Sequence, residues 1–218
     1  MAKYYPIMLD ICEKDCIVVG GGQVAERKVL SLLDAEANVI IISPRITEKL
    51  HKLHKEKKIH WINRYYQEGD LKEAYLVYVA TNDGKINEQC LDEARQEEIL
   101  INIVDKPAMC DFIVPASIKR GDLHITISTS GKSPMLSRKI REDLGRLFGE
   151  EYAVFLEGLG RLREKVLEEI TDIDLRREIF KKIVYSDYLD KIQTKEIEDA
   201  YEEMLRQYKE MIKKNGNR

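Results

Sequence analysis

The feature of this sequence that most constrains its fold is a run of three glycines between a short apolar segment and a helical pattern. Residues 16–19 are apolar, and Gly20-Gly21-Gly22-Gln23-Val24-Ala25 follows them directly. This order of strand, glycine turn and helix, with the spacing G-x-G-x-x-A, is typical of dinucleotide-binding units. Gly20 permits the tight turn, Gly22 lets the backbone approach a pyrophosphate, and Ala25 allows close packing of helix on strand. A tight turn without a ligand is the alternative explanation.

Short apolar runs and amphipathic stretches continue to alternate as far as residue 104. The expected strands are residues 16–19, 39–42, 59–63, 75–80 and 100–104, and the expected helices are residues 24–33, 47–57 and 86–97. Asp83 is placed near the start of the third helix as a cap. Strands that are apolar throughout indicate burial on both faces. The sequence therefore predicts the α/β fold class, with a Rossmann-type parallel sheet domain over residues 1–113.

The second half of the chain changes character. Two short strands, residues 112–114 and 123–128, are expected on either side of a turn at residues 119–122, before a helix with Ser133 as N-cap and Pro134 at N1. We expect residues 114–147 to form a small α+β segment that mediates a homodimer. Residues 148–218 contain 17 acidic and 14 basic residues and no strand pattern. Helices over residues 152–170, 174–184 and 194–213 would make this part a helical C-terminal domain.

Composition excludes several classes of protein. With 36 basic and 39 acidic residues among 218, the net charge of -3 gives no general attraction to nucleic acid. No apolar run approaches the roughly 20 residues of a membrane helix, and the amino terminus lacks a signal-peptide pattern, so we expect a cytoplasmic protein without a membrane partner. The four cysteines form no Cys-x-x-Cys pair, and His51 and His54 lie in a basic stretch expected to be a solvated helix face. We therefore expect no metal site.

Polar residues at the predicted strand ends complete the candidate nucleotide site. The second strand ends Ser43-Pro44-Arg45 and lacks the acid that usually binds the ribose hydroxyls. Ser43 and main-chain groups could bind the ribose instead, while Arg45 leaves NADP open through a contact to the 2′-phosphate. The expected cofactor-binding residues are Gly20, Gly22, Gln23, Val24, Ser43, Pro44, Arg45, Thr81, Asn82, Asp83 and Asn102.

Asp105 is the candidate catalytic residue. It follows the fifth predicted strand, and the carboxyl ends of parallel strands line the ligand crevice of an open α/β sheet. A carboxylate there can accept a proton or hold a cationic substrate atom. A loop aspartate that caps Lys106-Pro107 is the alternative. His124 is a reserve candidate because imidazole titrates near neutrality, although an ordinary strand histidine explains it as well.

Several motifs in this order resemble the precorrin-2 dehydrogenase family, the dehydrogenase and ferrochelatase module of siroheme synthase. The resemblance covers residues 5 to about 147, and the helical tail carries no motif of comparable strength. The matching motifs are Tyr5-Pro6-Ile7, Val18-Val19-Gly20-Gly21-Gly22, Val24-Ala25-Glu26-Arg27-Lys28, Ala80-Thr81-Asn82-Asp83, Asn102-Ile103-Val104-Asp105, Asp111-Phe112-Ile113-Val114-Pro115, Arg120-Gly121-Asp122-Leu123 and Ile127-Ser128-Thr129-Ser130-Gly131-Lys132-Ser133-Pro134.

The resemblance implies an NAD-dependent oxidation of precorrin-2 to sirohydrochlorin in the biosynthesis of siroheme or a related tetrapyrrole. In the family the aspartate of the Asn-x-Val-Asp motif is the proposed catalytic residue, which is Asp105 here. Ferrochelation to siroheme, a lyase reaction with Fe²⁺ as a further substrate, stays open. A tetrapyrrole of this class carries eight carboxylates, so cations and helix N-termini of the middle segment should bind it. The expected substrate-binding residues are Arg120, Ser128, Thr129, Lys132 and Arg138.

Two other classes of function remain open on the sequence. A Rossmann domain could act as a non-enzymatic nucleotide sensor, although a sensor would not require Asp105 together with a cationic segment. The protein could also be a chelatase without redox activity, since one carboxylate could take protons from pyrrole nitrogens as iron enters.

Overall fold

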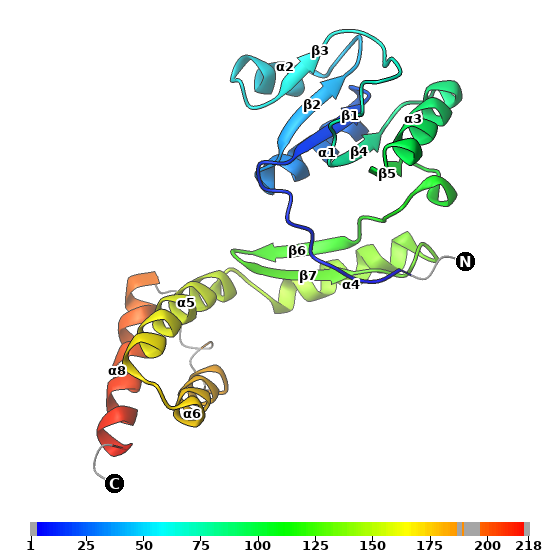
Figure 1. The fold of residues 1–218 in the computed structure, drawn as a ribbon. Helices are drawn as coiled ribbons and strands as arrows, with labels where there is room; N and C mark the ends of the chain where they lie inside the picture. The colour runs from blue at the N-terminus through cyan, green and yellow to red at the C-terminus, as the bar shows by residue number, and fades with distance from the viewer. Residues whose placement is uncertain (1–3, 187–188, 190–196, 216–218) are drawn as a thin grey trace. The chain divides into compact units, whose positions relative to one another are not determined.

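The chain folds into two compact units, Met1–Val114 and Pro115–Arg218 (Figure 1). The computed structural model describes residues 4–186, 189 and 197–215. The further division of the second unit at residue 147 stays a prediction.

A five-stranded parallel sheet forms the centre of the first unit. Its strands lie in the order β3-β2-β1-β4-β5. They are β1 (Asp15–Val19), β2 (Asn38–Ile42), β3 (His60–Ile62), β4 (Leu76–Val79) and β5 (Leu100–Ile103). The five strands expected between residues 16 and 104 are therefore all present, and the parallel Rossmann-type sheet is confirmed. Chain order reverses beside β1, and the carboxyl edge of the sheet at such a point is where open α/β sheets bind ligands.

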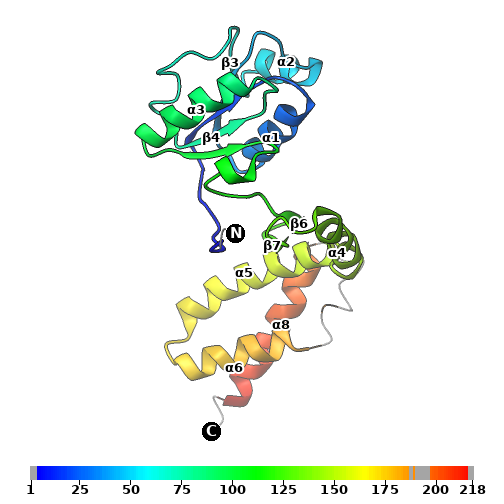
Figure 2. The ribbon, with the colours of Figure 1, turned by 90° about the vertical axis from the view of Figure 1, so that its right-hand side faces the viewer.

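Helices cover both faces of this sheet. They are α1 (Gln23–Asp34), α2 (Glu48–Lys55) and α3 (Gly84–Gln96). Alternate residues of a strand point to opposite faces, so Val18 packs with Val29 of α1 and Leu50 of α2, while Val19 packs in a second core with Cys90 of α3. Figure 2 shows α1 and α3 on either side of β4. Burial on both faces explains why residues 16–19 of β1 and residues 39–42 of β2 are apolar throughout.

Side-chain caps set the start of several helices. The Thr47 hydroxyl accepts from the Leu50 amide at 3.3 Å, and the Asp83 carboxylate accepts from the amides of Lys85 and Ile86. Ser133 caps the helix that begins at Pro134. The caps expected at Asp83 and Ser133 are confirmed, and each satisfies amides that the helix itself leaves without partners.

The strand expected at residues 112–114 is wrong, and Asp111, directly before this segment, is hydrogen-bonded to the open edge of β5. After the short 3₁₀ helix η1 (Pro107–Met109), the Asp111 amide donates to Ile101 O at 3.0 Å and its carboxylate accepts from the Ile101 amide at 3.0 Å. A side chain thus takes part of the role of a strand partner and blocks further pairing at this edge. Pro115, which has no amide hydrogen, follows before the next strand begins.

The second unit opens with an antiparallel hairpin packed on a helix. Its elements are β6 (Ala116–Arg120), β7 (Leu123–Ile127) and α4 (Pro134–Leu147). The expected turn is shorter than residues 119–122: β6 continues to Arg120, and a two-residue turn begins at Gly121, whose φ of 55° suits glycine. Ile118 is buried in this part of the unit.

Within the described part of the second unit, three further helices pack together, as Figure 2 shows. They are α5 (Glu151–Glu169), α6 (Ile173–Val184) and α8 (Ile197–Asn215). Their shared core contains Phe155, Leu162, Val166, Ile179, Ile183, Ala200, Met204 and Tyr208. The helical tail is confirmed, although residues 194–196 of the third expected helix lie outside the described residues. None of the described helices is long and apolar enough to cross a membrane.

Candidate nucleotide and catalytic site

The strand register brings the predicted site residues to one edge of the sheet. Val19, Val79 and Ile103 are the last residues of β1, β4 and β5, and they are register partners. The hydrogen-bonded rows continue past them: the Ala80 amide donates to Val19 O at 2.8 Å, and the Val104 amide donates to Val79 O at 3.0 Å. The glycine turn, the Thr81 loop and the Asp105 loop therefore all begin at the same edge.

Gly20 and Gly21 are required by contacts within the protein. Gly20 has φ of 120°, and a Cβ added there would lie 2.4 Å from Ala80 O. A Cβ on Gly21 would lie 2.0 Å from Arg45 O. The role expected for Gly20 in the turn is therefore supported, while the packing role of Gly21 was missed. The only signal in the sequence for this packing role was that the variable middle position of G-x-G is also a glycine.

Gly22 differs from its two neighbours, because a Cβ there would meet nothing within 4 Å. It is the N-cap of α1, with φ of -82°, and it supplies no side-chain cap to the helix. The amides at the start of α1, from Gln23 and Val24 onward, thus have no side-chain cap and carry a partial positive charge. Ala25 is fully buried against the sheet, as expected. Free space and uncapped amides fit a pyrophosphate, which is the feature that a dinucleotide requires.

The loop after β2 is fixed by its own hydrogen bonds. Ser43 is buried; its hydroxyl donates to Arg45 O at 2.7 Å, and its carbonyl accepts from Trp61 Nε1 at 2.8 Å. The Ser43 hydroxyl expected to reach a ribose is therefore occupied within the loop. Pro44 is half-buried beside it, while Arg45 is exposed and its guanidinium makes no hydrogen bond or ion pair with any described residue. Arg45 is the available polar side chain at this strand end.

A contact between α1 and this loop was not predicted. The Thr47 hydroxyl donates to Glu26 Oε2 at 2.6 Å, and the Thr47 amide donates to Gly21 O at 3.1 Å. These bonds tie the loop after β2 to the glycine turn and the first turn of α1. Their partners lie more than 20 residues apart in the chain, so no local pattern indicated them.

The loop after β4 contains residues with different roles. Thr81 Oγ1 accepts from the Asp83 amide at 2.8 Å, Asp83 caps α3, and Asn82 is exposed. Asn87 was missed: it is 4% exposed, its amide group donates to Thr81 O at 3.5 Å, and its Oδ1 is a buried acceptor without a partner among the described residues. An acceptor of this kind next to the sheet edge is available to a donor group of a ligand.

The loop after β5 presents Asp105 to solvent. Asp105 has φ of 61°, a left-handed conformation that aspartate tolerates better than most residues, and its carboxylate makes no hydrogen bond or ion pair within the described residues. Asn102 is buried, and its Nδ2 donates to Phe112 O at 2.8 Å. Asn102 therefore positions the chain behind the site, whereas the carboxylate of Asp105 is available to a ligand.

The five predicted substrate-binding residues lie in the second unit, and they differ in availability. Arg120 Nε donates to Phe148 O at 2.9 Å and its Nη2 donates to Gly145 O at 3.3 Å, so Arg120 caps the end of α4. The Thr129 hydroxyl exchanges hydrogen bonds with the backbone of Ser133 at 3.1 Å. Arg120 and Thr129 therefore make hydrogen bonds within this unit, and a contact of either residue with a substrate stays a prediction.

The other three substrate candidates are exposed. Lys132 follows a turn at Ser130 and Gly131, both with positive φ, and Ser128 Oγ accepts from the Ser130 amide at 3.1 Å. Arg138 pairs with Glu142 at 2.9 Å on α4. His124 is exposed on β7. Lys132 is consequently the cation of this set whose side chain has no ion pair within the described part of the chain.

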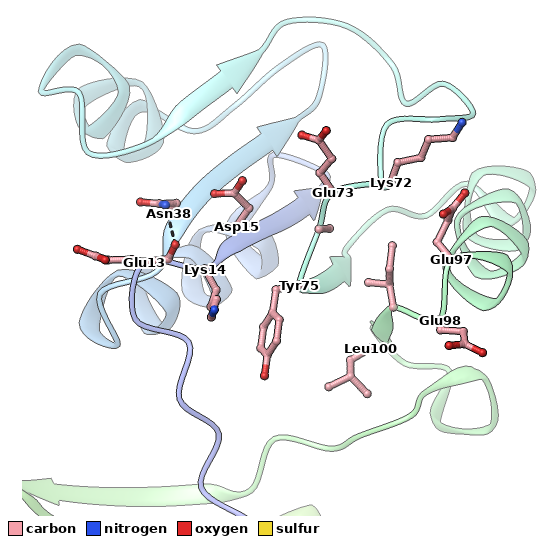
Figure 3. A pocket seen from close by; sticks show the side chains of 12 residues that line it. Glu13, Lys14, Asp15, Asn38, Lys72, Glu73, Tyr75, Glu97, Glu98 and Leu100 are labelled. Atoms are coloured by element: carbon pink, nitrogen blue, oxygen red, sulfur yellow. Dashed lines mark hydrogen bonds between the residues drawn. The ribbon is translucent and has the colours of Figure 1, made fainter.

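A depression of about 660 Å³ lies at the opposite edge of the sheet (Figure 3). Asp15, at the start of β1, and Leu100, at the start of β5, contribute to its wall. Its charged side chains are Glu13, Lys14, Asp15, Lys72, Glu73, Glu97 and Glu98. A mainly acidic surface at the amino ends of the strands does not suit a pyrophosphate, so we assign the nucleotide to the carboxyl edge.

No group of three histidine, cysteine or carboxylate side chains that could hold a metal ion occurs among residues 4–186, 189 and 197–215. The four cysteines are free, and burial raises the pKa of the Cys16 thiol to about 11 and that of the Cys90 thiol to about 12. Both thiols therefore act as packing groups at neutral pH.

Comparison with known protein families supports a nucleotide-binding role for the unit that contains the glycine turn. The family model described as "Putative NAD(P)-binding" matches residues 7–116, which is half of the chain. The chain belongs to this NAD(P)-binding family. A second model, "Sirohaem biosynthesis protein central", matches residues 120–147 of the NAD(P)-binding protein.

Relatives of this NAD(P)-binding protein include siroheme synthases from Ruthia magnifica and Nitrosococcus oceani. The first is 34% identical over 91% of the chain and 42% of the relative, and the second is 35% identical over 93% and 44%. The chain thus spans less than half the length of these relatives. A solved structure titled "SirC, precorrin-2 dehydrogenase" has a TM-score of 0.78 at 24% identity, covering 93% of this chain and all of that one. The fold expected from the sequence is thereby confirmed.

Proposed function

We propose that this protein catalyses the NAD-dependent dehydrogenation of precorrin-2 to sirohydrochlorin in siroheme biosynthesis. The observation that carries the proposal is that two features lie at the same edge of the sheet. One is the N-terminus of α1 at Gly22, which has no side-chain cap, and the other is the carboxylate of Asp105, which has no partner among the described residues. The names of the siroheme synthases and of the precorrin-2 dehydrogenase support the choice of substrate. A nucleotide sensor would need only the first of these two features.

The residues of the carboxyl edge are suited to a dinucleotide. The amides at the start of α1 would bind the pyrophosphate, and the loop from Ser43 to Arg45 would lie beside a ribose. The buried Oδ1 acceptor of Asn87 and the loop at Thr81 would line the other half of the dinucleotide. NAD, when bound, supplies the hydride acceptor for the reaction.

Asp105 would handle the proton of the reaction. Dehydrogenation removes two hydrogens from the substrate: one departs as a hydride, and the other departs as a proton. The carboxylate of Asp105 accepts that proton as a general base and then releases it to solvent, to which it is exposed. The left-handed turn at Asp105 and the bond from Asn102 to Phe112 O hold the loop that carries it.

The preference for NAD over NADP is part of the proposal. No carboxylate is placed at the end of β2 to reject a 2′-phosphate, and the exposed Arg45 could pair with one. We therefore propose NAD as the cofactor with tolerance of NADP. Comparison of kcat/KM for the two cofactors tests this, and a tenfold preference for NADP, about 1.4 kcal/mol, would reverse the assignment.

We also propose a homodimer formed through residues 114–147. On α4, Met135 is 77% exposed and Leu147 is 68% exposed, and large apolar side chains of this kind are commonly covered by a partner. Light scattering after gel filtration tests the proposal, and a monomer at micromolar concentration would contradict it. A cytoplasmic location remains a prediction.

The decisive assay supplies precorrin-2 anaerobically with NAD and follows reduced nicotinamide and metal insertion separately. We expect reduced nicotinamide to form in proportion to sirohydrochlorin. Nucleotide binding without turnover would indicate the sensor, and insertion of Fe²⁺ into sirohydrochlorin without any nicotinamide reduction would indicate the chelatase.

A further inference from the structure

Lys28 occupies an unusual position on the second turn of α1. Its side chain is half-buried, and Nζ lies 5.0 Å from the centroid of the Tyr78 ring. Tyr78 belongs to β4 and is 7% exposed, and its ring meets the Phe112 ring edge-on at 5.5 Å. The ammonium group is therefore held on an aromatic surface, next to the sheet rather than in open solvent.

The described neighbours of Lys28 provide no carboxylate. Burial raises the pKa of Tyr78 to about 12, so its phenol is neutral at physiological pH. Burial also raises the pKa of the nearby Cys110 thiol. Lys28 makes no ion pair with a carboxylate among the described residues, and burial together with the adjacent Arg27 lowers the pKa of Lys28. The positive charge is partly desolvated and has no counter-ion within residues 4–186, 189 and 197–215.

An arrangement of this kind is costly for the folded protein. A partly buried cation loses water, and an aromatic face replaces only part of that interaction. An ordinary surface position would keep the ammonium solvated at no such cost. Partly buried charges without a partner, next to a ligand crevice, are candidates for the direct binding of an oppositely charged group.

The position of Lys28 connects the two parts of the site. Its helix begins at the glycine turn, and Tyr78 is the register partner of Asn102, which lies three residues before Asp105. All of these residues belong to the first unit, so their placement does not depend on the second unit. An anion bound at Lys28 would lie beside the end of β4, away from the α1 amides that would bind a pyrophosphate.

We infer that Lys28 binds one carboxylate of the tetrapyrrole substrate and so positions the macrocycle at the β4 and β5 edge. The inference rests on the proposed function, which supplies a substrate with several carboxylates. Lys28 is a substrate-binding residue in this account, and the proton is still transferred by Asp105.

The test compares Lys28→Met with a matched control, Lys49→Met, in which an exposed lysine of α2 is replaced. Binding of sirohydrochlorin is titrated by its own visible absorbance, and the Kd for NAD is measured separately. We expect Lys28→Met to weaken sirohydrochlorin binding by about tenfold or more, as for other bonds to charged groups, with NAD affinity within twofold of wild type. Lys49→Met should change neither.

Thermal unfolding without ligands separates a binding role of Lys28 from a structural one. If Lys28 stabilised the fold, its replacement would lower the unfolding temperature. Lys28→Met should unfold at the wild-type temperature or above, because it removes a desolvated charge without a partner. Unchanged sirohydrochlorin affinity overturns the inference, as does a loss confined to NAD, which would assign Lys28 to the pyrophosphate. A wild-type protein that binds no sirohydrochlorin overturns it too. Wild-type protein that binds sirohydrochlorin but reduces no NAD with precorrin-2 refutes only the proposed enzyme activity.

Discussion

Replacement of Gly22 by aspartate should separate nucleotide binding from folding. Gly22 is the N-cap of α1, with φ of -82° and ψ of -173°, and no atom lies within 4 Å of a Cβ added there. Aspartate adopts this conformation readily and is among the best N-cap residues. Its carboxylate would accept from the free amides that are otherwise available to a pyrophosphate. Gly22→Asp should therefore fill the anion site with an anion of its own.

The two expected effects have opposite signs. Aspartate in place of an N-cap glycine gains roughly a few tenths of a kcal/mol from the cap bond, and the helix dipole adds about 0.3–1 kcal/mol, so we expect a gain of about 1 kcal/mol in the free energy of unfolding. For a chain of 218 residues this raises Tm by roughly 2–4 °C. Two charges of the same sign about 4 Å apart repel by about 4 kcal/mol at an effective dielectric constant of 20, so NAD affinity should fall by about 10³-fold.

The assay combines calorimetric unfolding with an NAD titration. Gly20→Ala is the matched control from the same turn, because its Cβ would lie 2.4 Å from Ala80 O at a φ of 120°. That variant should lose stability, whereas Gly22→Asp should gain it. A folded Gly22→Asp protein with wild-type NAD affinity would refute the assignment of the pyrophosphate to α1.

Three further substitutions test individual contacts. Glu93 is 5% exposed, and its carboxylate accepts from the Tyr66 hydroxyl and from the amides of Gly69 at 3.0 Å and Leu71 at 2.7 Å. Glu93→Gln should therefore lower the free energy of unfolding by about 2–3 kcal/mol and leave the Kd for NAD unchanged. Thr47→Val removes the α2 cap and the bond to Glu26, and denaturant titration should show a loss of about 1 kcal/mol; a loss below 0.3 kcal/mol would contradict this role. Arg45→Ala should lower kcat/KM with NADP by about tenfold and change the value with NAD less than twofold, and equal effects on both would exclude a contact to the 2′-phosphate.

The parts of the fold that depend on local pattern could be predicted from the sequence. The five strands follow from continuous apolar runs, and the caps at Asp83 and Ser133 follow from residue type at a helix start. Contacts between distant parts of the chain could not. The clash that requires Gly21 involves Arg45, 24 residues later, and the hydrogen bonds of Asp111 to the edge of β5 join residues ten positions apart.

The same distinction applies to the candidate site. Strand ends placed Asp105 and the glycine turn at one edge correctly, because register in a parallel sheet follows from strand order and length. The sequence did not indicate that Arg120 would cap α4 or that the hydroxyl of Ser43 would bond within its own loop. Charge and residue type identify groups able to bind a ligand, but tertiary hydrogen bonds decide which of them remain available.

The most direct test of the central claim is the rate of precorrin-2 dehydrogenation by Asp105→Asn, measured anaerobically beside the Kd for NAD. The substitution keeps the size of the side chain and removes its basic oxygen, and the exposed carboxylate makes no bond within the described residues whose loss would unfold the protein. A general base contributes about 10²–10⁴ in rate, so kcat should fall by that factor while NAD affinity stays within twofold. A fall in kcat of less than about threefold, below roughly 0.7 kcal/mol, would show that another group removes the proton.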